Sequence, residues 1–252
     1  MLRFRAALAC FTRLPTGAVP LQAYQQALGR LPFVGLVLGF FVGSIAWLAW
    51  LCLPAPLAAV LSCCAWAALT GGLHLDGVAD CGDSLFVEAS PARRLEIMQD
   101  SRLGTFGAVA LLAVLGIKTT ALAGLFSSLP EAQGMALWLL IQRCLLAAVL
   151  ARCLVLSMLL LPSARPGGMA DSMRHGVRPA DKGLALLLLL CVVLLNGMTG
   201  LYALLAAGIA CALVLRAAYK SIGGITGDVA GCLVEVMECA ALTASCLSFA
   251  RL

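Results

Sequence analysis

The chain alternates long apolar blocks with short polar segments, and the block lengths are typical of helices that cross a membrane. A helix needs about 20 apolar residues to span a bilayer core, and the blocks lack the ten-residue polar–apolar alternation of membrane strands. In the first block, Gly35, Gly39 and Gly43 recur at a spacing that lets another helix approach closely. The seven expected spans cover residues 33–53, 57–73, 106–126, 135–161, 184–195, 201–215 and 229–250.

We therefore expect an all-α, polytopic integral membrane bundle with about seven transmembrane helices. The chain has no internal repeat and no low-complexity linker, so residues 1–252 are expected to form one domain. The sequence is also compatible with a homo-oligomer.

Composition supports a membrane protein and argues against several other classes. The chain is 62% hydrophobic and 12% charged, about half the charge of a soluble domain, and its mean hydropathy is +1.03. The net charge of +5 is better explained by basic loops at a membrane surface than by a nucleic-acid partner. Twelve cysteines without a Cys-x-x-Cys pair support neither a zinc site nor a redox motif.

The basic residues are distributed unevenly between the two sides of the expected bundle. The N-terminal segment and the polar loops 74–105, 162–183 and 216–228 hold 13 of the 17 Lys and Arg residues. Three more lie within spans, and the other side holds only Arg251. By the positive-inside rule, the N-terminus and these loops face the cytoplasm.

The first polar loop carries an acidic stripe. If the segment is helical, Asp76, Asp80 and Asp83 point the same way, because each residue turns the helix by about 100°. Like charges on one stripe repel unless a cation lies among them, and a set of oxygen ligands favours Mg²⁺. The alternative is a solvated loop whose acids are balanced by nearby arginines.

The third polar loop is rich in glycine and opens the last span. Asp228, Glu235 and Glu238 share one face of that helix, and backbone N–H groups near Gly227 favour an anion. The loop lacks the Lys-Ser/Thr ending of a Walker motif, so a simple capped turn is the competing interpretation. Acids within a span are functional or paired with bases, and we expect pairing for Glu238 in particular.

Other polar residues are weaker candidates for chemistry. His74 is either a general base for a hydroxyl nucleophile or an interfacial polar residue, and a carboxylate is an equally good proton acceptor. Arg165 is either a phosphate contact or an ordinary basic residue of a cytoplasmic loop.

Several motifs together resemble the cobalamin synthase, or adenosylcobinamide-GDP ribazoletransferase, family. They are LTGGLHLDGVADCGDSL (69–85), RRLEIMQDSRLGTFG (93–107), SARPGG (163–168) and GGITGDVAGCLVEVMECAAL (223–242), with shorter matches at 11–15 and 31–39. The resemblance spans nearly the whole chain.

The resemblance implies a membrane-bound, Mg²⁺-dependent enzyme that acts last in assembly of the cobalamin nucleotide loop. The substrates would be adenosylcobinamide-GDP and α-ribazole or its 5′-phosphate. The ribose 3′-hydroxyl of the acceptor would attack the phosphorus attached to cobinamide, and GMP would leave. The products would be adenosylcobalamin, or its 5′-phosphate, and GMP.

The resemblance also suggests roles for individual residues, with Asp100 and Arg102 matching the family's Asp-Ser-Arg segment. The expected metal ligands are Asp76, Asp80, Asp83, Asp228 and Glu235. The expected catalytic residues are Asp80, His74 and Asp100, and the expected phosphate contacts are Arg102, Arg165 and Gly227.

Two other functions remain open at this stage. A CDP-alcohol phosphotransferase carries an Asp-Gly-x-Ala motif like that of residues 76–79, but residue 80 is Asp where that family has Arg. An ion-coupled transporter would also explain charges within spans, although such proteins often contain repeated halves.

Overall fold

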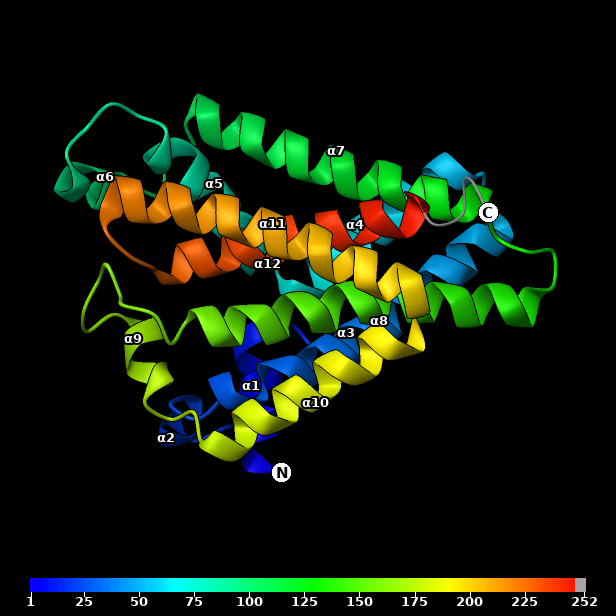
Figure 1. Cartoon of the computed structure of the whole chain (residues 1–252), viewed down its shortest axis with the longest axis horizontal. Helices are drawn as coiled ribbons and strands as arrows, with labels where there is room; N and C mark the ends of the chain where they lie inside the picture. Colours follow the sequence, from blue (N-terminus) through cyan, green and yellow to red (C-terminus); the bar gives the residue numbers. More distant parts are fainter. Residues whose placement is uncertain (248–252) are drawn as a thin grey trace.

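The computed structural model describes residues 1–247, and all regular elements in this range are helices (Figure 1). Five long apolar helices can cross a membrane by length and composition. They are α3 (Leu31–Cys52, preceded by the 3₁₀ turn η1, Leu28–Arg30), α7 (Thr105–Ser127), α8 (Gln133–Met158), α11 (Gly197–Ile222) and α12 (Gly227–Leu247). The shorter helices are α1 (Leu2–Phe11), α2 (Leu21–Tyr24), α4 (Ala55–Thr70), α5 (Leu73–Leu85), α6 (Pro91–Ile97), α9 (Met169–Arg174) and α10 (Pro179–Leu195). The all-helical, polytopic fold is confirmed.

The helix ends differ from the expected spans in several places, and α10, for example, begins at Pro179 rather than at residue 184. The second span ends at Gly71 and Gly72, whose positive φ angles of 66° and 73° turn the chain, so that α5 leaves α4 at 94°. Helix α11 continues to Ile222, well past the expected end, and stops where Gly223 adopts φ of 77°. Residues 248–250 of the last span, and Arg251, lie outside the described residues.

These differences affect the number of spans. Helix α10 has 17 residues, and α4 has 16 residues followed by the bend. The described chain therefore has five membrane-length helices, or six if the bent pair α4–α5 counts as one span. We expected about seven, because apolar blocks were counted without knowing that α4 ends at a bend and that α10 has only 17 residues.

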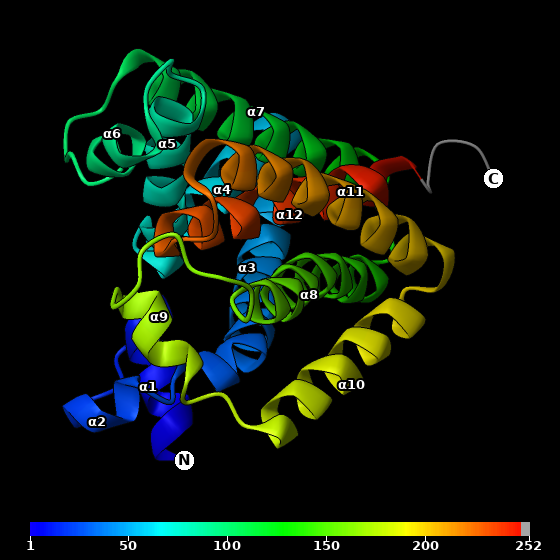
Figure 2. The same cartoon turned by 60° about the vertical axis from the view of Figure 1, so that its left-hand side comes forward.

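Close packing explains how the bundle is held together. A Cβ atom at Gly35, Gly39 or Gly43 of α3 would overlap the backbone of α8, so these glycines let the two helices touch, as their spacing predicts. Helix α12 lies in the middle of the bundle and packs against α5, α7, α8 and α11 (Figure 2). Its burial on nearly all sides makes any charged side chain along it dependent on a partner.

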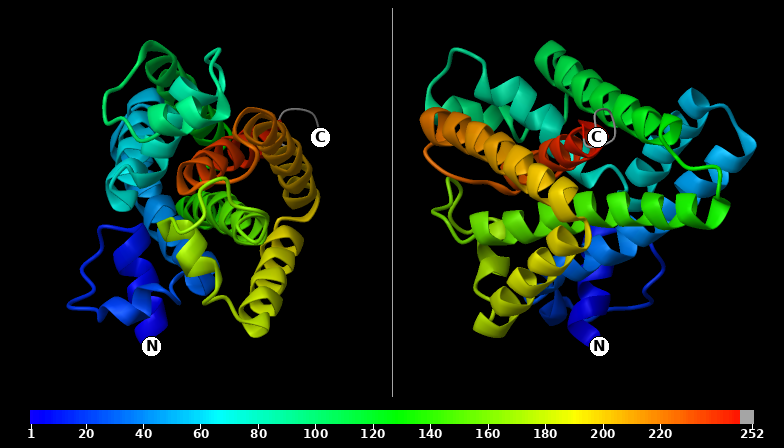
Figure 3. Two further views of the ribbon diagram at one scale, coloured as in Figure 1. Left: turned by 90° about the vertical axis from the view of Figure 1, so that its left-hand side faces the viewer. Right: turned by 45° about the vertical axis from the view of Figure 1, so that its right-hand side comes forward.

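The polar segments gather at one end of the bundle. Helices α5, α6 and α9 and the loops before α7 and α12 lie at this end, on the left in Figure 1. The left panel of Figure 3 looks onto this end, where the starts of α12 and α5 lie near α9 and the N-terminal segment. Residues far apart in the sequence therefore meet there.

Candidate active site

A cavity of about 820 Å³ opens at the polar end of the bundle. Side chains from α1, α2, α5, α8, α9 and α12 line it, together with the loops that precede α9 and α12. Its polar wall includes Asp76, Ser163, Arg165, Asp171, Thr226 and Asp228. This volume lies in the range of about 300–1,000 Å³ that is typical of small-molecule sites.

The start of α12 is held by a loop-to-loop contact. The backbone N–H of Ile225 donates to the carbonyl of Pro162 (3.1 Å), and that of Ala164 donates to the carbonyl of Ile225 (3.0 Å). Thr226 caps the helix by accepting a hydrogen bond from the N–H of Val229 (3.2 Å). The loop before α9 is thereby fixed against the first turn of α12.

This contact brings Arg165 to Asp228. The two side chains form an ion pair with 3.5 Å between Nη1 and Oδ2, and each remains about 30% exposed to the cavity. Arg165 also donates to the carbonyl of Leu95 (3.2 Å), which limits its movement. Its guanidinium is suited to contact an anionic group in the cavity.

Two glycines bring the acidic stripe to the same place. A Cβ at Gly77 of α5 would overlap the carbonyl oxygen of Asp228, and Gly231 of α12 lies against the backbone of His74. Asp76 therefore faces the same cavity as Asp228. The carboxyl group of Asp80 is within electrostatic reach of Asp76, Asp228, Asp83 and Arg165. A cation among these acids would relieve their mutual repulsion.

Asp83 has a different partner from the one expected. Its two carboxylate oxygens accept hydrogen bonds from the backbone N–H groups of Gly104 and Gly107, both at 2.7 Å. These donors belong to the start of α7, so Asp83 caps that helix. Gly104 and Gly107 have no side chain that would displace it. Asp83 thus has a structural role as a cap, and its place among the metal ligands stays a prediction.

Glu235 is also placed away from the acidic group. Its carboxylate is buried and forms an ion pair with Lys118 of α7, with 2.5 Å between Nζ and Oε2. Lys118 also binds Glu238 (2.7 Å), which in turn binds Arg152 (2.5 Å). Pairing, expected for Glu238, thus holds for Glu235 as well. Glu235 lies two turns, roughly 10 Å, from Asp228 along α12, so this ion pair is the only partner that the described residues give it, and its role as a metal ligand stays a prediction.

His74 lies between the cavity and these buried charges. Its side chain is buried, lines the cavity, and has an Nδ1 atom without a hydrogen-bond partner among the described residues. The charges of Arg152, Glu238 and Lys118 act on the ring. His74 is therefore not exposed to solvent, and its role as a general base or as an interfacial polar residue stays a prediction.

Asp100 and Arg102 do not line the cavity. They pair with each other in the loop between α6 and α7, with 2.6 Å between Nη2 and Oδ2, and Arg102 is 87% exposed. The hydrogen bond from the Arg102 side chain lowers the pKa of Asp100 to about 2. The structure does not bring these two expected site residues to the other acids.

The acidic side chains at the cavity can be compared with the ligands that a metal ion requires. Within residues 1–247, no group of three or more His, Cys, Asp and Glu side chains is arranged to hold a metal. Mg²⁺, however, is commonly held by one or two carboxylates together with substrate phosphates. Asp76 and Asp228 on the cavity wall, with Asp80 beside them, fit that arrangement.

Some residues of the cavity escaped the sequence argument. Asp171 of α9 lines it and pairs with Arg174 (2.8 Å). Asp171 is an acidic residue among the basic residues of the polar segment 162–183, and this contrast could have marked it as a candidate site residue. Phe11 and Tyr24 also line the cavity, and no polar pattern marks them as site residues.

The fold and the cavity together define a class: a polytopic helical membrane protein with a polar-lined cavity at one end. Comparison with known proteins narrows this class. The family of cobalamin-5-phosphate synthases matches residues 3–246, so the chain belongs to that family.

Relatives from several bacteria agree with this assignment. The chain is 36% identical to the adenosylcobinamide-GDP ribazoletransferase of Roseiflexus sp. (strain RS-1), over 96% of this chain and 88% of the relative. It is 39% identical to the protein of the same name from Stutzerimonas stutzeri (strain A1501), over 95% of this chain and 94% of the relative. No solved structure matches the chain.

Proposed function

We propose that this protein is an adenosylcobinamide-GDP ribazoletransferase that works at the cytoplasmic face of a bacterial inner membrane. It joins adenosylcobinamide-GDP to α-ribazole or α-ribazole 5′-phosphate, and it releases GMP together with adenosylcobalamin or its 5′-phosphate. The observation that carries the proposal is family membership along nearly the whole chain, combined with a cavity that holds Asp76, Asp228 and Arg165. The CDP-alcohol phosphotransferase and the transporter are the less favoured alternatives.

The reaction is a displacement at phosphorus. The ribose 3′-hydroxyl of the acceptor forms a bond to the phosphorus attached to cobinamide, and the bond from that phosphorus to the GMP oxygen breaks. GMP leaves with the bonding electron pair, and the hydroxyl proton passes to a base of the protein. The carboxylate of Asp80 and the buried ring of His74 are the two acceptors near the acidic wall.

Arg165 and the first turn of α12 orient the diphosphate. The Arg165 guanidinium lies at the cavity wall, and the backbone N–H groups that follow Gly227 carry the partial positive charge of a helix start. Asp228 keeps Arg165 in place until a phosphate competes for it. These groups position the phosphorus for in-line attack.

Asp76 and Asp228, with Asp80 beside them, are the residues that would hold Mg²⁺. When bound there, the ion would neutralise charge on the diphosphate and on the departing GMP oxygen. Asp83 and Glu235 are left out because each already has a partner in the fold.

Purified protein in lipid nanodiscs tests the proposal. With both substrates and Mg²⁺, we expect GMP and the cobalamin product in equal amounts. Asp76→Asn or Asp80→Asn should lower turnover by roughly 100-fold or more, because each removes a charge that positions the reacting groups. Glu131→Gln, at an exposed position at the other end of the bundle, is the matched control and should keep full activity.

Several results would overturn the proposal. Wild-type protein that releases no GMP would refute the transferase function. Substrate flux into liposomes without product would favour transport, and turnover of a CDP-alcohol would favour the other phosphotransferase. Unchanged turnover in both aspartate variants would remove these residues from the mechanism.

A further inference from the structure

The cavity has a second wall whose chemistry differs from the acidic one. Phe11 of α1, Leu21 and Tyr24 of α2, and Leu28 and Leu31 at the start of α3 form this apolar wall. These five residues all come from the N-terminal segment and the start of α3, whereas the acids come from α5, α9 and α12. One cavity therefore offers a charged face and an apolar face with aromatic side chains.

We propose that the apolar wall binds the base of the acceptor nucleoside, while Arg165 and the first turn of α12 hold the diphosphate of the donor beside the acidic wall. This inference rests on the proposed function. A ribazole carries a flat, apolar benzimidazole base on a polar ribose. With the base against Phe11 and Tyr24, the ribose lies toward the acidic wall, which is where its hydroxyl must attack. Aromatic side chains favour contact with such a flat ring.

Size supports this choice of occupant. The cavity of about 820 Å³ suits a ligand of drug size, such as a nucleoside monophosphate, with room for a diphosphate beside it. A corrin macrocycle with its side chains is several times larger than such a ligand. The corrinoid part of the donor must therefore stay at the cavity mouth, so the flat group that enters is a nucleoside base. An apolar wall suits the benzimidazole of the acceptor better than the guanine of the donor, because guanine carries polar groups on its edges that such a wall leaves without partners. Leu21, 87% exposed, marks the rim of the apolar wall.

The apolar wall is fixed in position by buried polar contacts. Asp181 at the start of α10 is 2% exposed and pairs with Arg3 (3.4 Å) and with Arg30 (3.5 Å). Arg3 also donates to Gln26 (2.6 Å) and to the carbonyl of Gly176 (3.0 Å). These bonds hold both ends of the N-terminal segment against α10 and the α9 loop. Because this segment is already held in position, little conformational entropy is lost when a ligand binds to it.

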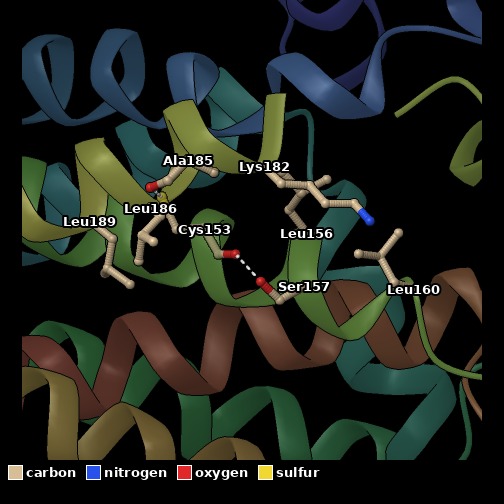
Figure 4. Close-up of a pocket in the computed structure, with 8 residues that line it drawn as sticks. All are labelled: Cys153, Leu156, Ser157, Leu160, Lys182, Ala185, Leu186 and Leu189. Carbon is tan, nitrogen blue, oxygen red and sulfur yellow. Dashed lines mark hydrogen bonds between the residues drawn. The ribbon is translucent and has the colours of Figure 1, made fainter. Parts of the chain in front are cut away.

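A second pocket lies on the other side of α8 and provides a control. It is lined by Cys153, Leu156, Ser157, Leu160, Lys182, Ala185, Leu186 and Leu189, between α8 and α10 (Figure 4). Its volume of about 100 Å³ is too small for a nucleoside. A truncation there removes a similar apolar side chain without touching the proposed base site.

Steady-state kinetics with each substrate varied in turn test the proposal. Tyr24→Ala should raise the KM for α-ribazole by roughly tenfold, because the base loses its contact with the aromatic ring. Leu21→Ala should raise the same KM by less, because a smaller apolar contact is lost. The KM for adenosylcobinamide-GDP should change by less than about twofold in both. Tyr24→Phe should behave like wild type, because the ring rather than the hydroxyl makes the contact. Leu189→Ala in the second pocket should change neither KM.

The outcomes separate this proposal from the proposed function. Wild-type protein without GMP release would refute both. Wild-type turnover combined with an unchanged acceptor KM in the variants, or with an equal rise in both KM values, would overturn the base site alone. If Tyr24→Ala does not fold, Leu21→Ala, at an exposed position, still decides the question.

Discussion

Glu238→Gln removes one negative charge from the buried ion network formed by Lys118, Arg152, Glu235 and Glu238. The four side chains carry two positive and two negative charges, and all are between 0% and 3% exposed. The carboxylate of Glu238 forms two ion pairs, one with Arg152 at 2.5 Å and one with Lys118 at 2.7 Å. After the substitution, Arg152 has no acid beside it. Its Nε and Nη2 atoms already lack hydrogen-bond partners within the described residues, so no other ion pair there takes the place of the lost one.

The expected cost follows from this burial. Removing one partner of a buried ion pair leaves an uncompensated charge and typically costs about 3–5 kcal/mol. Glu96→Gln is the matched control, because Glu96 pairs with Arg93 at 2.7 Å and both side chains are more than 60% exposed. Such an exposed pair contributes at most about 1 kcal/mol. The same chemical change should therefore have a several-fold larger effect on stability at position 238.

Reversible unfolding in mixed micelles, followed by circular dichroism, measures both free energies of unfolding. The double variant Glu238→Leu with Arg152→Met should recover most of the loss, because it leaves Lys118 paired with Glu235 and no charge unpaired. A loss for Glu238→Gln no larger than that for Glu96→Gln would refute the reasoning. So would a double variant less stable than Glu238→Gln alone.

Three further predictions concern the site and its supports. Asp83→Ala should destabilise the fold by about 0.5–2 kcal/mol and speed hydrogen exchange at the start of α7, because the cap is lost; unchanged exchange there would contradict the capping role. Asp181→Asn should speed exchange of the amides in residues 1–30 by about tenfold, since Arg3 and Arg30 lose their charged partner; equal rates would show that other contacts hold this segment. EDTA should abolish GMP release, and Mg²⁺ should restore it better than Zn²⁺; full activity in EDTA would argue against a divalent ion.

Much of the fold followed from the distribution of apolar residues. Each of the five long helices overlaps an expected span, although α11 is longer than expected, and the polar loops gather at one end as predicted, because block length and side-chain polarity are local properties. The bend between α4 and α5 was missed. Two consecutive glycines permit a left-handed turn, but they do not reveal whether the next helix continues or turns aside.

The candidate site was predictable only in part. Asp76, Asp228, Arg165, Gly227 and His74 do meet around one cavity, as their residue types suggested. Asp83 and Glu235 have the same carboxylate chemistry, yet one caps α7 and the other pairs with Lys118. Spacing along a helix shows which side chains share a face, but it does not show what lies opposite them.

The amino-acid sequence by itself determined a helical membrane protein, the membership of its family and the set of acids and bases available for chemistry. Each of these depends on residue type and spacing along one chain. Only the tertiary structure decided which carboxylates remain available for a ligand and which are used to cap or neutralise the fold. It also decided that the N-terminal segment supplies the apolar wall of the cavity. Both outcomes depend on which helices pack together, and no single segment carries that information.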